Sequence, residues 1–595
     1  MNMMTKRMFL WLLAILSLGI FQPITALADE SQKLPSGIER SQIGQKIQDF
    51  VKEHEKTTAG MTTAVFDKNG TIYHANFGYT DKEKGIKVDD KSVFEWGSVT
   101  KLTVWISVMQ LWEEGKIDLE TEIKTYLPKD FLKTLRYDKP ITMLDLMNHQ
   151  AGFEESGAAM NYNDISMEEF LATKQPAQIF EPGTKTAYSN YSAALTAYIV
   201  EQVSGQSFSD YVYKHIFQPL DMDKTAILPG FTDNDYVREK RKEDKGYSTE
   251  GQSLGASNFY MDIYPAGQAA GTMADFQKFA QALLSQDKLF KRKETWTTLY
   301  TASSTYPGTD IPLNMHGFWT QEYGTTLVGH GGNTDAFSSN ILLDLKNGIG
   351  YAVMTNQSQE QIYNSEMPQL IFGDKKKTDK TAFKNFQPGF YRKARYFETG
   401  PISITRGFLY TSYAPKSADN PLLTQGYAVL SHANNQETIT NADRDSYKIA
   451  DIEIYKDYAM YALFFLGLVY ALINLIISGV ADLIRLIRKT PAKAPVDLKI
   501  WNYLTSLTIL AVGFNSYLIF TVMTVSKTGI MQPWRYMVFA GLGILLLAGL
   551  LYPWVTKAKS RLSKGRLFLT VLTSLAALTI IANILYWSLY QWWVL

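Results

Sequence analysis

Cysteine is absent from the 595 residues of the sequence. Its absence excludes disulfide bonds, thiolate catalysis and cysteine-ligated metal sites. An excess of charge is also lacking, because 59 Lys and Arg residues stand against 58 Asp and Glu residues. This balance gives no indication of a nucleic-acid partner. The seven histidines are scattered without the spacing of metal ligands, so we expect neither a metal nor another cofactor.

The first residues have the features of a secretory signal peptide. Lys6 and Arg7 precede an apolar run up to Phe21, and Ala26-Leu27-Ala28 offers a small-residue cleavage site. We predict a signal peptide over residues 1–28, followed by the mature chain. An uncleaved N-terminal anchor is the alternative, although the apolar run is short for a spanning helix.

Apolar residues make up 46% of the sequence and are concentrated near its C-terminus. Four segments there are long enough to cross a hydrocarbon core of about 30 Å. We predict spanning helices over residues 458–481, 500–525, 536–555 and 567–594. The loops 482–499 and 556–566 are rich in Lys and Arg, whereas 526–535 carries only Lys527 and Arg535. The positive-inside rule therefore places the two rich loops in the cytoplasm, with the C-terminus and the preceding domains outside.

The predicted spans complete a division of the chain into four parts. These are a signal peptide (1–28), a main domain (29–373), a linker with a small β-rich domain (374–455) and a transmembrane region (456–595). The β-rich domain could pack on the main domain or on the membrane. Aromatic residues at the C-terminus are expected to form the outer interfacial belt, namely Trp587, Tyr590, Trp592 and Trp593.

The segment Glu95-Trp96-Gly97-Ser98-Val99-Thr100-Lys101-Leu102 carries the first chemical signal. It places a Ser-x-x-Lys at the start of a predicted amphipathic helix that runs to Gly115. Residues three positions apart share a helix face, so a lysine of lowered pKa could take the proton of the serine hydroxyl. Alone the Ser-x-x-Lys pattern is weak evidence for catalysis, because a serine that caps a helix and a solvent-exposed lysine give the same sequence pattern.

Two later motifs strengthen this interpretation. Tyr188-Ser189-Asn190 lies on a loop before a predicted helix over residues 193–203. Gly329-His330-Gly331-Gly332 lies among predicted antiparallel strands, which cover residues 325–328, 337–343 and 349–354. The three motifs stand in the order that a penicillin-recognising hydrolase would need, which favours a nucleophilic Ser98 over a capping serine.

Three other segments give local predictions. Asp67-Lys68-Asn69-Gly70 predicts a hairpin with a two-residue type I′ loop. His149 precedes a glycine turn at a predicted helix end, where a structural donor is a more ordinary role than catalysis. The glycine-rich segment from Pro265 to Thr272 is interpreted as backbone that approaches another segment closely, because it lacks the lysine of a phosphate loop.

From Val93 to Asn356 the chain resembles the class C β-lactamase-related serine hydrolases, the penicillin-binding-protein-like group of peptidase family S12. The matching elements, in chain order, are Gly97 to Lys101, Gly115 to Leu119, Leu144 to Gly152, Pro182-Gly183, Tyr188 to Asn190, Pro219 to Met222 and His330 to Gly332. The resemblance implies an α+β fold of the β-lactamase/transpeptidase type. In it an antiparallel sheet is flanked by helices and a helical subdomain, with the site in the cleft between them.

The resemblance also implies catalytic roles for matching residues. Ser98 would be the acylated nucleophile, and Lys101 its proton acceptor. Tyr188 would be a second acid/base, with its phenolate stabilised by Lys101, and would pass a proton to the leaving group. Asn190 would hydrogen-bond the substrate amide or Lys101.

The last motif would serve substrate binding. The backbone N–H groups of Ser98 and Asn333 would form the oxyanion hole, next to Gly332. His330 stands where β-lactamases and carboxypeptidases of the family have a lysine that helps bind the substrate carboxylate. This departure argues against an efficient β-lactamase.

The function implied by the resemblance is a membrane-anchored, extracytoplasmic serine hydrolase. It would act on D-amino-acid amides or esters, either in the cell wall or in an exported N-acyl-D-amino-acid prodrug. A β-lactamase is one alternative, and a weakly catalytic penicillin-binding sensor that signals through its helices is another. The expected partners are a small-molecule or cell-wall substrate and the lipid bilayer, and the oligomeric state is left open.

Overall fold

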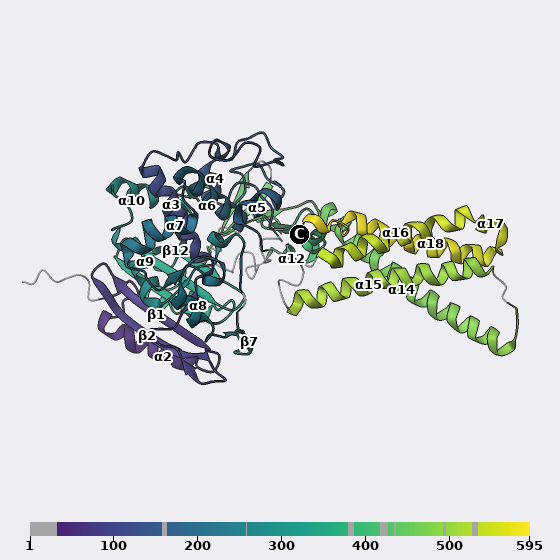
Figure 1. Ribbon diagram of the computed structural model, residues 1–595, viewed down its shortest axis with the longest axis horizontal. Helices are drawn as coiled ribbons and strands as arrows, with labels where there is room; N and C mark the ends of the chain where they lie inside the picture. Colours follow the sequence, from purple (N-terminus) through teal and green to yellow (C-terminus); the bar gives the residue numbers. More distant parts are fainter. Residues whose placement is uncertain are drawn as a thin grey trace, which may run out of the picture.

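A computed structural model of the protein describes residues 33–156, 164–257, 259–378, 386–416, 427–433, 436–491, 495–525 and 533–594. The predicted signal peptide lies outside these residues. Strands and short helices form one end of the molecule, here called the head (residues 33–449), and four long helices form the other end, here called the bundle (Figure 1). The predicted domain boundaries at residues 373 and 455 stay predictions.

The centre of the head is an antiparallel sheet of nine strands. In order across the sheet they are β3 (Ile86–Lys87), β2 (Gly70–Asp81), β1 (Gly60–Asp67), β14 (Ile349–Thr355), β13 (Ser338–Asp344), β12 (Thr326–Asn333), β11 (Phe318–Glu322), β10 (Pro312–Met315) and β9 (Ser304–Thr305). β1 comes early in the chain and β14 late, so their pairing joins the first and last strands of this sheet in the sequence. The strands predicted over residues 325–328, 337–343 and 349–354 are confirmed as β12, β13 and β14, and the glycine motif runs on inside β12.

The loop between β1 and β2 differs from the predicted type I′ loop. Asp67 pairs with Gly70, so the hairpin and its two-residue loop are confirmed. However, neither Lys68 nor Asn69 has the positive φ that a type I′ turn requires. The Asp67 carboxylate instead accepts hydrogen bonds from the N–H groups of Asn69 and Gly70, at 2.8 and 3.1 Å, and forms an Asx turn.

Helices cover both faces of this sheet. On one face lies α2 (Ile43–Glu53), whose Ile43, Ile47 and Val51 share a buried cluster with sheet residues. The other face packs against α9 (Met273–Ser285) in the largest core cluster. The remaining helices of the head include α3 (Lys101–Glu113), α4 (Met143–Met147), α5 (Met167–Thr173), α6 (Asn190–Ser204), α7 (Phe208–Val212), α8 (Asp235–Arg241), α10 (Lys293–Leu299), α11 (Gln369–Phe372) and α12 (Arg406–Leu409).

The helix α3 is buried on all sides, which corrects the amphipathic prediction. Every residue from Lys101 to Met109 is buried. Its hydroxyl groups are satisfied locally, because Thr103 donates to Thr100 O at 2.7 Å and Ser107 donates to Thr103 O at 2.8 Å. A helix that is surrounded in this way carries Lys101 into the interior of the head.

A second antiparallel sheet, here called the linking sheet, follows in the chain. In spatial order its strands are β16 (Thr411–Ala414), β15 (Gly389–Lys393), β19 (Asp445–Lys448), β18 (Gln436–Thr440) and β17 (Val429–Ala433). On one side, the N–H of Tyr188 donates to the carbonyl oxygen of Asp443 at 3.1 Å. On the other side, Arg392 forms ion pairs with Glu453 and Asp457 of the bundle. The linking sheet therefore contacts both the main part of the head and the first helix of the bundle, and packing on the membrane itself stays a prediction.

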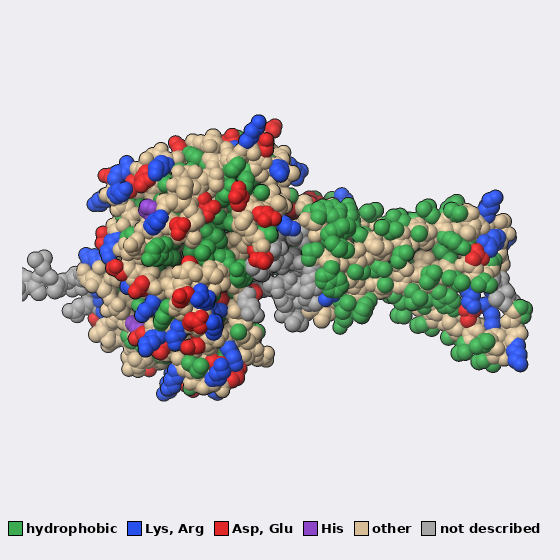
Figure 2. Space-filling model, viewed as in Figure 1, with side chains coloured by type: hydrophobic (Ala, Val, Ile, Leu, Met, Phe, Trp, Pro, Cys, Tyr) green, Lys and Arg blue, Asp and Glu red, His purple; other side chains and the backbone are tan. Residues whose placement is uncertain are grey.

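The bundle consists of four helices that are long and apolar enough to cross a membrane. They are α14 (Asp451–Arg488), α15 (Val496–Val525), α16 (Pro533–Val555) and α18 (Lys564–Tyr586). Hydrophobic side chains cover its visible surface, and Lys and Arg side chains gather at the end away from the head (Figure 2). Four long apolar helices are confirmed where the spans were predicted, and the last of them ends at Tyr586 and not at residue 594. The C-terminus lies beside the head (Figure 1).

The joint between head and bundle is centred on Asp457, which has no exposed surface. Its carboxylate accepts hydrogen bonds from Arg406 and from the Tyr586 hydroxyl, both at 2.8 Å. Trp587 is also fully buried and stacks on Tyr461, with ring centroids 5.1 Å apart. The prediction that Trp587 belongs to an interfacial belt is therefore wrong, because this residue is part of the core of the joint.

Beneath the Ser98 segment lies a buried ion pair. Glu95 is on β4 (Phe94–Glu95), which pairs with β8 (Ala270–Gly271). Its carboxylate contacts Arg241 at 2.5 Å and accepts hydrogen bonds from Thr334 and from Ser257, the latter at 2.9 Å. Because Thr334 directly follows β12, this carboxylate ties the Ser98 segment to the end of that strand.

We predict that Glu95→Ala destabilises the head by about 3 kcal/mol, because the buried Arg241 guanidinium loses its closer carboxylate and keeps that of Asp244, at 3.7 Å. Thermal unfolding of the detergent-solubilised protein, followed by near-UV circular dichroism, measures the loss. Arg238→Ala is the control, since its ion pair with Asp235 is exposed and worth less than about 1 kcal/mol. Equal unfolding temperatures for the two variants would show that the buried pair does not hold this region together.

Candidate active site

Ser98 lies in a short 3-10 turn, Gly97–Thr100, that leads directly into α3. Ser98 is half-buried, whereas Gly97, Val99 and Thr100 in the same turn are buried. Gly97 has a φ of 52°, and a Cβ there would lie 2.6 Å from the backbone nitrogen of Asn333. Glycine is therefore required at this position for β12 to pass beside the turn.

Lys101 lies one turn further along and points its amine at Ser98. Its Nζ donates to Ser98 Oγ at 3.1 Å, to Asn190 Oδ1 at 2.8 Å and to the carbonyl oxygen of Ala266 at 2.5 Å. The last contact confirms the prediction that the segment from Pro265 to Thr272 makes a close backbone approach. Lys101 and Asn190 are thus brought together with Ser98, as the motifs suggested.

The electrostatic surroundings favour a neutral Lys101 amine. Burial lowers the pKa of Lys101 well below its usual value, and the positive charge of Arg395 lowers it further. The negative charge of Glu155 acts in the opposite direction. A neutral amine keeps two N–H groups for Asn190 and Ala266, and its lone pair can then accept the hydroxyl proton of Ser98.

Tyr188 lies on the loop before α6, which starts at Asn190, three residues before its predicted start. Lys101 Nζ is 4.8 Å from the centre of the Tyr188 ring. Burial raises the pKa of Tyr188, while the Ser98 hydroxyl and Arg395 reduce that rise. The raised pKa favours a protonated phenol in the free protein, in contrast to the phenolate that the resemblance implied. Among the described residues the hydroxyl has no partner of normal hydrogen-bond geometry, so its proton is available.

His149 and His330 lie close to the ring of Tyr188. The His149 ring centroid is 4.5 Å from that of Tyr188, and its Nδ1 accepts the N–H of Ser189 at 3.2 Å. His149 is therefore an acceptor at Nδ1 and not the donor that was predicted. Burial is the main cause that lowers the pKa of His149 well below its usual value. A neutral His149 thus holds the loop that carries Tyr188.

His330 is fully buried and stacks on Trp319, with ring centroids 4.2 Å apart. Burial and the charge of Lys101 lower the pKa of His330 to about 3. The imidazole is therefore neutral near pH 7 and cannot act as the cation that the family lysine supplies. Its position 6.0 Å from the Tyr188 ring fits support of Tyr188, and its predicted contact with substrate stays a prediction.

Gly332 and Asn333 bring β12 against the Ser98 turn. A Cβ on Gly332 would lie 1.9 Å from the carbonyl oxygen of Trp96 and 3.0 Å from the backbone nitrogen of Ser98. The strand therefore runs directly beside the turn, with no space for a side chain at Gly332. The oxyanion hole of Ser98 and Asn333 that the resemblance implies stays a prediction.

Arg395 is the residue of this site that the sequence did not reveal. It follows β15 of the linking sheet, and its guanidinium carbon lies 4.9 Å from the centre of the Tyr188 ring. Its Nε donates to Glu155, and its side chain remains 25% exposed. The N–H of Glu155 also donates to the carbonyl oxygen of Tyr396 at 3.0 Å. The linking sheet therefore supplies a charged group to the Ser98 site.

Comparisons with known proteins agree with this geometry. Residues 43–372 match the Beta-lactamase family. The teichoic acid D-alanine hydrolase of Staphylococcus aureus is 28% identical over 234 residues, which cover 39% of this chain and 56% of that protein. The putative penicillin-binding protein PbpX of Bacillus subtilis (strain 168) is 27% identical over 290 residues, covering 47% of this chain and 67% of PbpX. The chain thus spans little more than half the length of the first of these relatives.

Solved structures with a similar arrangement include the octameric penicillin-binding protein homologue from Pyrococcus abyssi. It has a TM-score of 0.49 and 21% identity, and the match covers 69% of this chain and 100% of that chain. The D-amino acid amidase from Ochrobactrum anthropi SV3, complexed with D-phenylalanine, has a TM-score of 0.47 and 22% identity. That match covers 56% of this chain and 98% of the amidase chain.

We predict that Gly332→Ala abolishes reaction of Ser98 with a fluorophosphonate probe, which labels nucleophilic serines. The added Cβ would overlap the carbonyl oxygen of Trp96 and push β12 away from the turn. Gly331→Ala is the matched control, because the nearest atoms to its Cβ are 3.8 and 3.9 Å away. Mass spectrometry of the peptide that contains Ser98 measures the extent of labelling in both variants. Equal labelling of Gly332→Ala and Gly331→Ala would contradict the close approach of β12 to the Ser98 turn.

Proposed function

The chain belongs to the Beta-lactamase family, and on that premise we propose that this serine hydrolase forms an acyl-enzyme at Ser98 with D-amino-acid amides or esters outside the membrane. Membership confirms the predicted β-lactamase/transpeptidase-like fold and the prediction of a serine hydrolase. The observation that carries the proposal is the buried Lys101 amine, 3.1 Å from Ser98 Oγ. The name of the staphylococcal relative, a D-alanine hydrolase, supports the substrate class.

In the proposed acylation step, the neutral Lys101 amine takes the hydroxyl proton as Ser98 Oγ attacks the substrate carbonyl carbon. The backbone N–H groups of Ser98 and Asn333 stabilise the negative oxygen of the tetrahedral intermediate. Tyr188 donates its phenolic proton to the leaving amine or alcohol, and the Lys101 ammonium returns a proton to Tyr188. The carbonyl carbon is then bonded to Ser98 Oγ.

Deacylation reverses these roles, with water in place of the leaving group. The neutral Lys101 amine takes the phenolic proton of Tyr188, while the Tyr188 oxygen takes a proton from the water that attacks the acyl carbon. The bond between the acyl carbon and Ser98 Oγ then breaks, and the Lys101 ammonium gives its proton to Ser98 Oγ. Asn190 holds the Lys101 amine in position throughout, because it accepts a hydrogen bond from Nζ at 2.8 Å. The two steps use side chains and backbone N–H groups of this chain, with water as the attacking group in the second.

The proposed orientation places the head outside the cytoplasm. The protein is a membrane protein by its four apolar helices. The loops rich in Lys and Arg join the helices at the end of the bundle away from the head, where Figure 2 shows the basic side chains. The positive-inside rule favours this end for the cytoplasm, so the head would meet substrates of the cell envelope or exported metabolites.

The alternative of a β-lactamase is less well supported. In that activity a cation at the third motif helps bind the substrate carboxylate, according to the resemblance. His330 occupies this position, and its pKa of about 3 leaves it uncharged. We therefore propose D-amino-acyl esters and amides, and not β-lactams, as substrates.

The central test uses the full-length protein in detergent with D-alanyl esters, D-alanyl amides and their L-enantiomers. We expect release of D-alanine by the native protein, and a loss of about 10⁴-fold or more in Ser98→Ala. Intact-mass spectrometry should detect the acyl group on the native protein only. Turnover that persists in Ser98→Ala, or equal turnover of L- and D-substrates, would count against the proposal.

We also predict opposite pH shifts for two variants. Activity requires neutral Lys101, so it rises as pH increases through the pKa of Lys101. Arg395→Gln removes a charge that lowers this pKa, and the acidic limb of kcat/KM should move to higher pH by about one unit. Glu155→Gln removes a charge that raises it, and the limb should move to lower pH.

Lys393→Gln is the control for this pair, because it removes a positive charge from β15 that does not act on Lys101. Its acidic limb should coincide with that of the native protein. Shifts of the same sign in Arg395→Gln and Glu155→Gln would indicate a change of fold and not of charge.

A further inference from the structure

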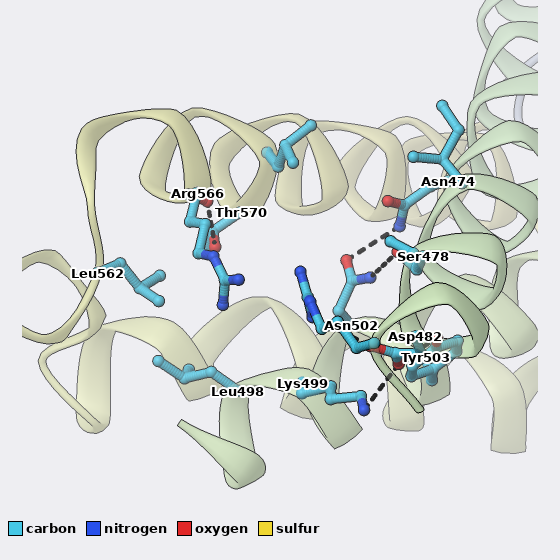
Figure 3. A pocket seen from close by; sticks show the side chains of 14 residues that line it. Asn474, Ser478, Asp482, Leu498, Lys499, Asn502, Tyr503, Leu562, Arg566 and Thr570 are labelled. Atoms are coloured by element: carbon cyan, nitrogen blue, oxygen red, sulfur yellow. Dashed lines mark hydrogen bonds and ion pairs between the residues drawn. The ribbon is translucent and has the colours of Figure 1, made fainter. Parts of the chain in front are cut away.

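A pocket opens between α14, α15 and α18 at the end of the bundle away from the head, with a cavity of about 180 Å³ (Figure 3). Its lining includes the three basic residues Arg485, Lys499 and Arg566 and one acid, Asp482. None of the sequence motifs in the head accounts for this pocket. It lies at the opposite end of the bundle from the Ser98 site.

The acid of this pocket is already fully engaged. Asp482 contacts Lys499 at 2.7 Å and Arg485 at 3.1 Å, and it accepts a hydrogen bond from the Tyr503 hydroxyl at 2.8 Å. The cations therefore outnumber the acid by two. The pocket carries net positive charge at a place where water is less abundant than at an open surface.

Among the described residues, Arg566 is the basic residue of this pocket whose guanidinium has no counterion. Its guanidinium points into the pocket (Figure 3) and forms no hydrogen bond or ion pair with the residues that the structure describes. The charges of Arg485 and Asp482 both act on it, but the Asp482 carboxylate is already paired with Lys499 and Arg485. A pocket with two arginines and an acid that is already paired suits an anion, and the planar fork of arginine suits phosphate in particular.

The polar side chains deeper in the pocket do not compete for this anion. Asn474 donates to Asn502 Oδ1 and to Ser506 Oγ, both at 2.9 Å, and Asn502 in turn donates to Ser478 at 3.3 Å. These groups satisfy one another between the helices. The anion is thus held near the mouth, at the level of the basic residues.

The rim of the pocket indicates what carries the anion. Ile477 and Leu569 also line it, and their side chains are 61% and 47% exposed on the outer surface of the bundle. In a membrane this surface faces acyl chains. A ligand with a phosphate group and hydrocarbon tails would contact both the cations and the rim, whereas free phosphate would contact the cations alone.

We propose that this pocket binds the phosphate group of a membrane phospholipid, in the leaflet on the side away from the head. The phosphate would bridge Arg566 and Arg485, and the acyl chains would lie along Ile477 and Leu569. Binding at the ends of three helices would fasten α14, α15 and α18 together. The inference does not depend on the chemistry proposed for Ser98.

The test measures lipid retention by native mass spectrometry on the full-length protein in detergent. Phosphatidylglycerol, diacylglycerol of the same chain length and inorganic phosphate are the probes. We expect phosphatidylglycerol to be retained and diacylglycerol to be lost. Arg566→Gln should weaken the retention of phosphatidylglycerol about fivefold. Arg566→Lys keeps the positive charge, so it should retain more phosphatidylglycerol than Arg566→Gln.

Arg488→Gln is the matched control, because Arg488 is an exposed cation at the same end of α14 but outside the pocket. It should retain phosphatidylglycerol as the native protein does. Equal losses in Arg488→Gln and Arg566→Gln would overturn the proposal in favour of general surface charge. Equal retention of diacylglycerol, or displacement of the lipid by an equal concentration of inorganic phosphate, would overturn the assignment to a phospholipid.

Discussion

The removal of one lysine amine from water is the constraint on which the rest of the head depends. A charged amine is costly in a buried position, and the cost itself makes Lys101 a base. Keeping that amine beside Ser98 requires α3 to be surrounded by other elements, with hydrogen-bond partners at three points around Nζ. These partners come from the 3-10 turn before α3, from α6 and from the segment before α9. The tertiary fold and the chemistry of the site are therefore set by the same packing.

The linking sheet extends this dependence beyond the main sheet of the head. It holds the backbone of Tyr188 through Asp443 and places Arg395 beside the Tyr188 ring. Through Arg392 it also contacts Asp457 at the start of the bundle. One small sheet thus contributes to the electrostatics of the site and to the attachment of the head to the membrane helices.

The sequence was informative where function is carried by short motifs. Ser98, Lys101, Tyr188 and Asn190 lie in two segments whose spacing and resemblance predicted that they meet, and the structure brings them together. The strands β12 to β14 and the four long helices were also predictable, because each has a strong periodic or apolar signal. The exact ends of these elements were less predictable, because the last long helix ends at Tyr586 and not at residue 594.

The place of Arg395 in the site, the burial of Trp587 and the burial of α3 on all sides could not be predicted in this way, for physical reasons that differ. Arg395 reaches the site only through packing between segments distant in the chain, and its neighbours in sequence form no motif. A tryptophan at the end of an apolar helix suits a lipid interface or a protein core equally well, and the stacking on Tyr461 decides between them. The apolar pattern of α3 did not reveal how many other elements surround it.

The linking sheet also determines what a proteolytic cut between the head and the bundle would leave of the site. Cleavage just after Gly373 would free the nine-stranded sheet together with Ser98 and Lys101. The freed fragment would lack Arg395 and the backbone contact to Tyr188, so a cut at this point would separate the nucleophile from part of its electrostatic environment. Cleavage beyond Lys448, the last residue of β19, would instead leave a head that keeps both.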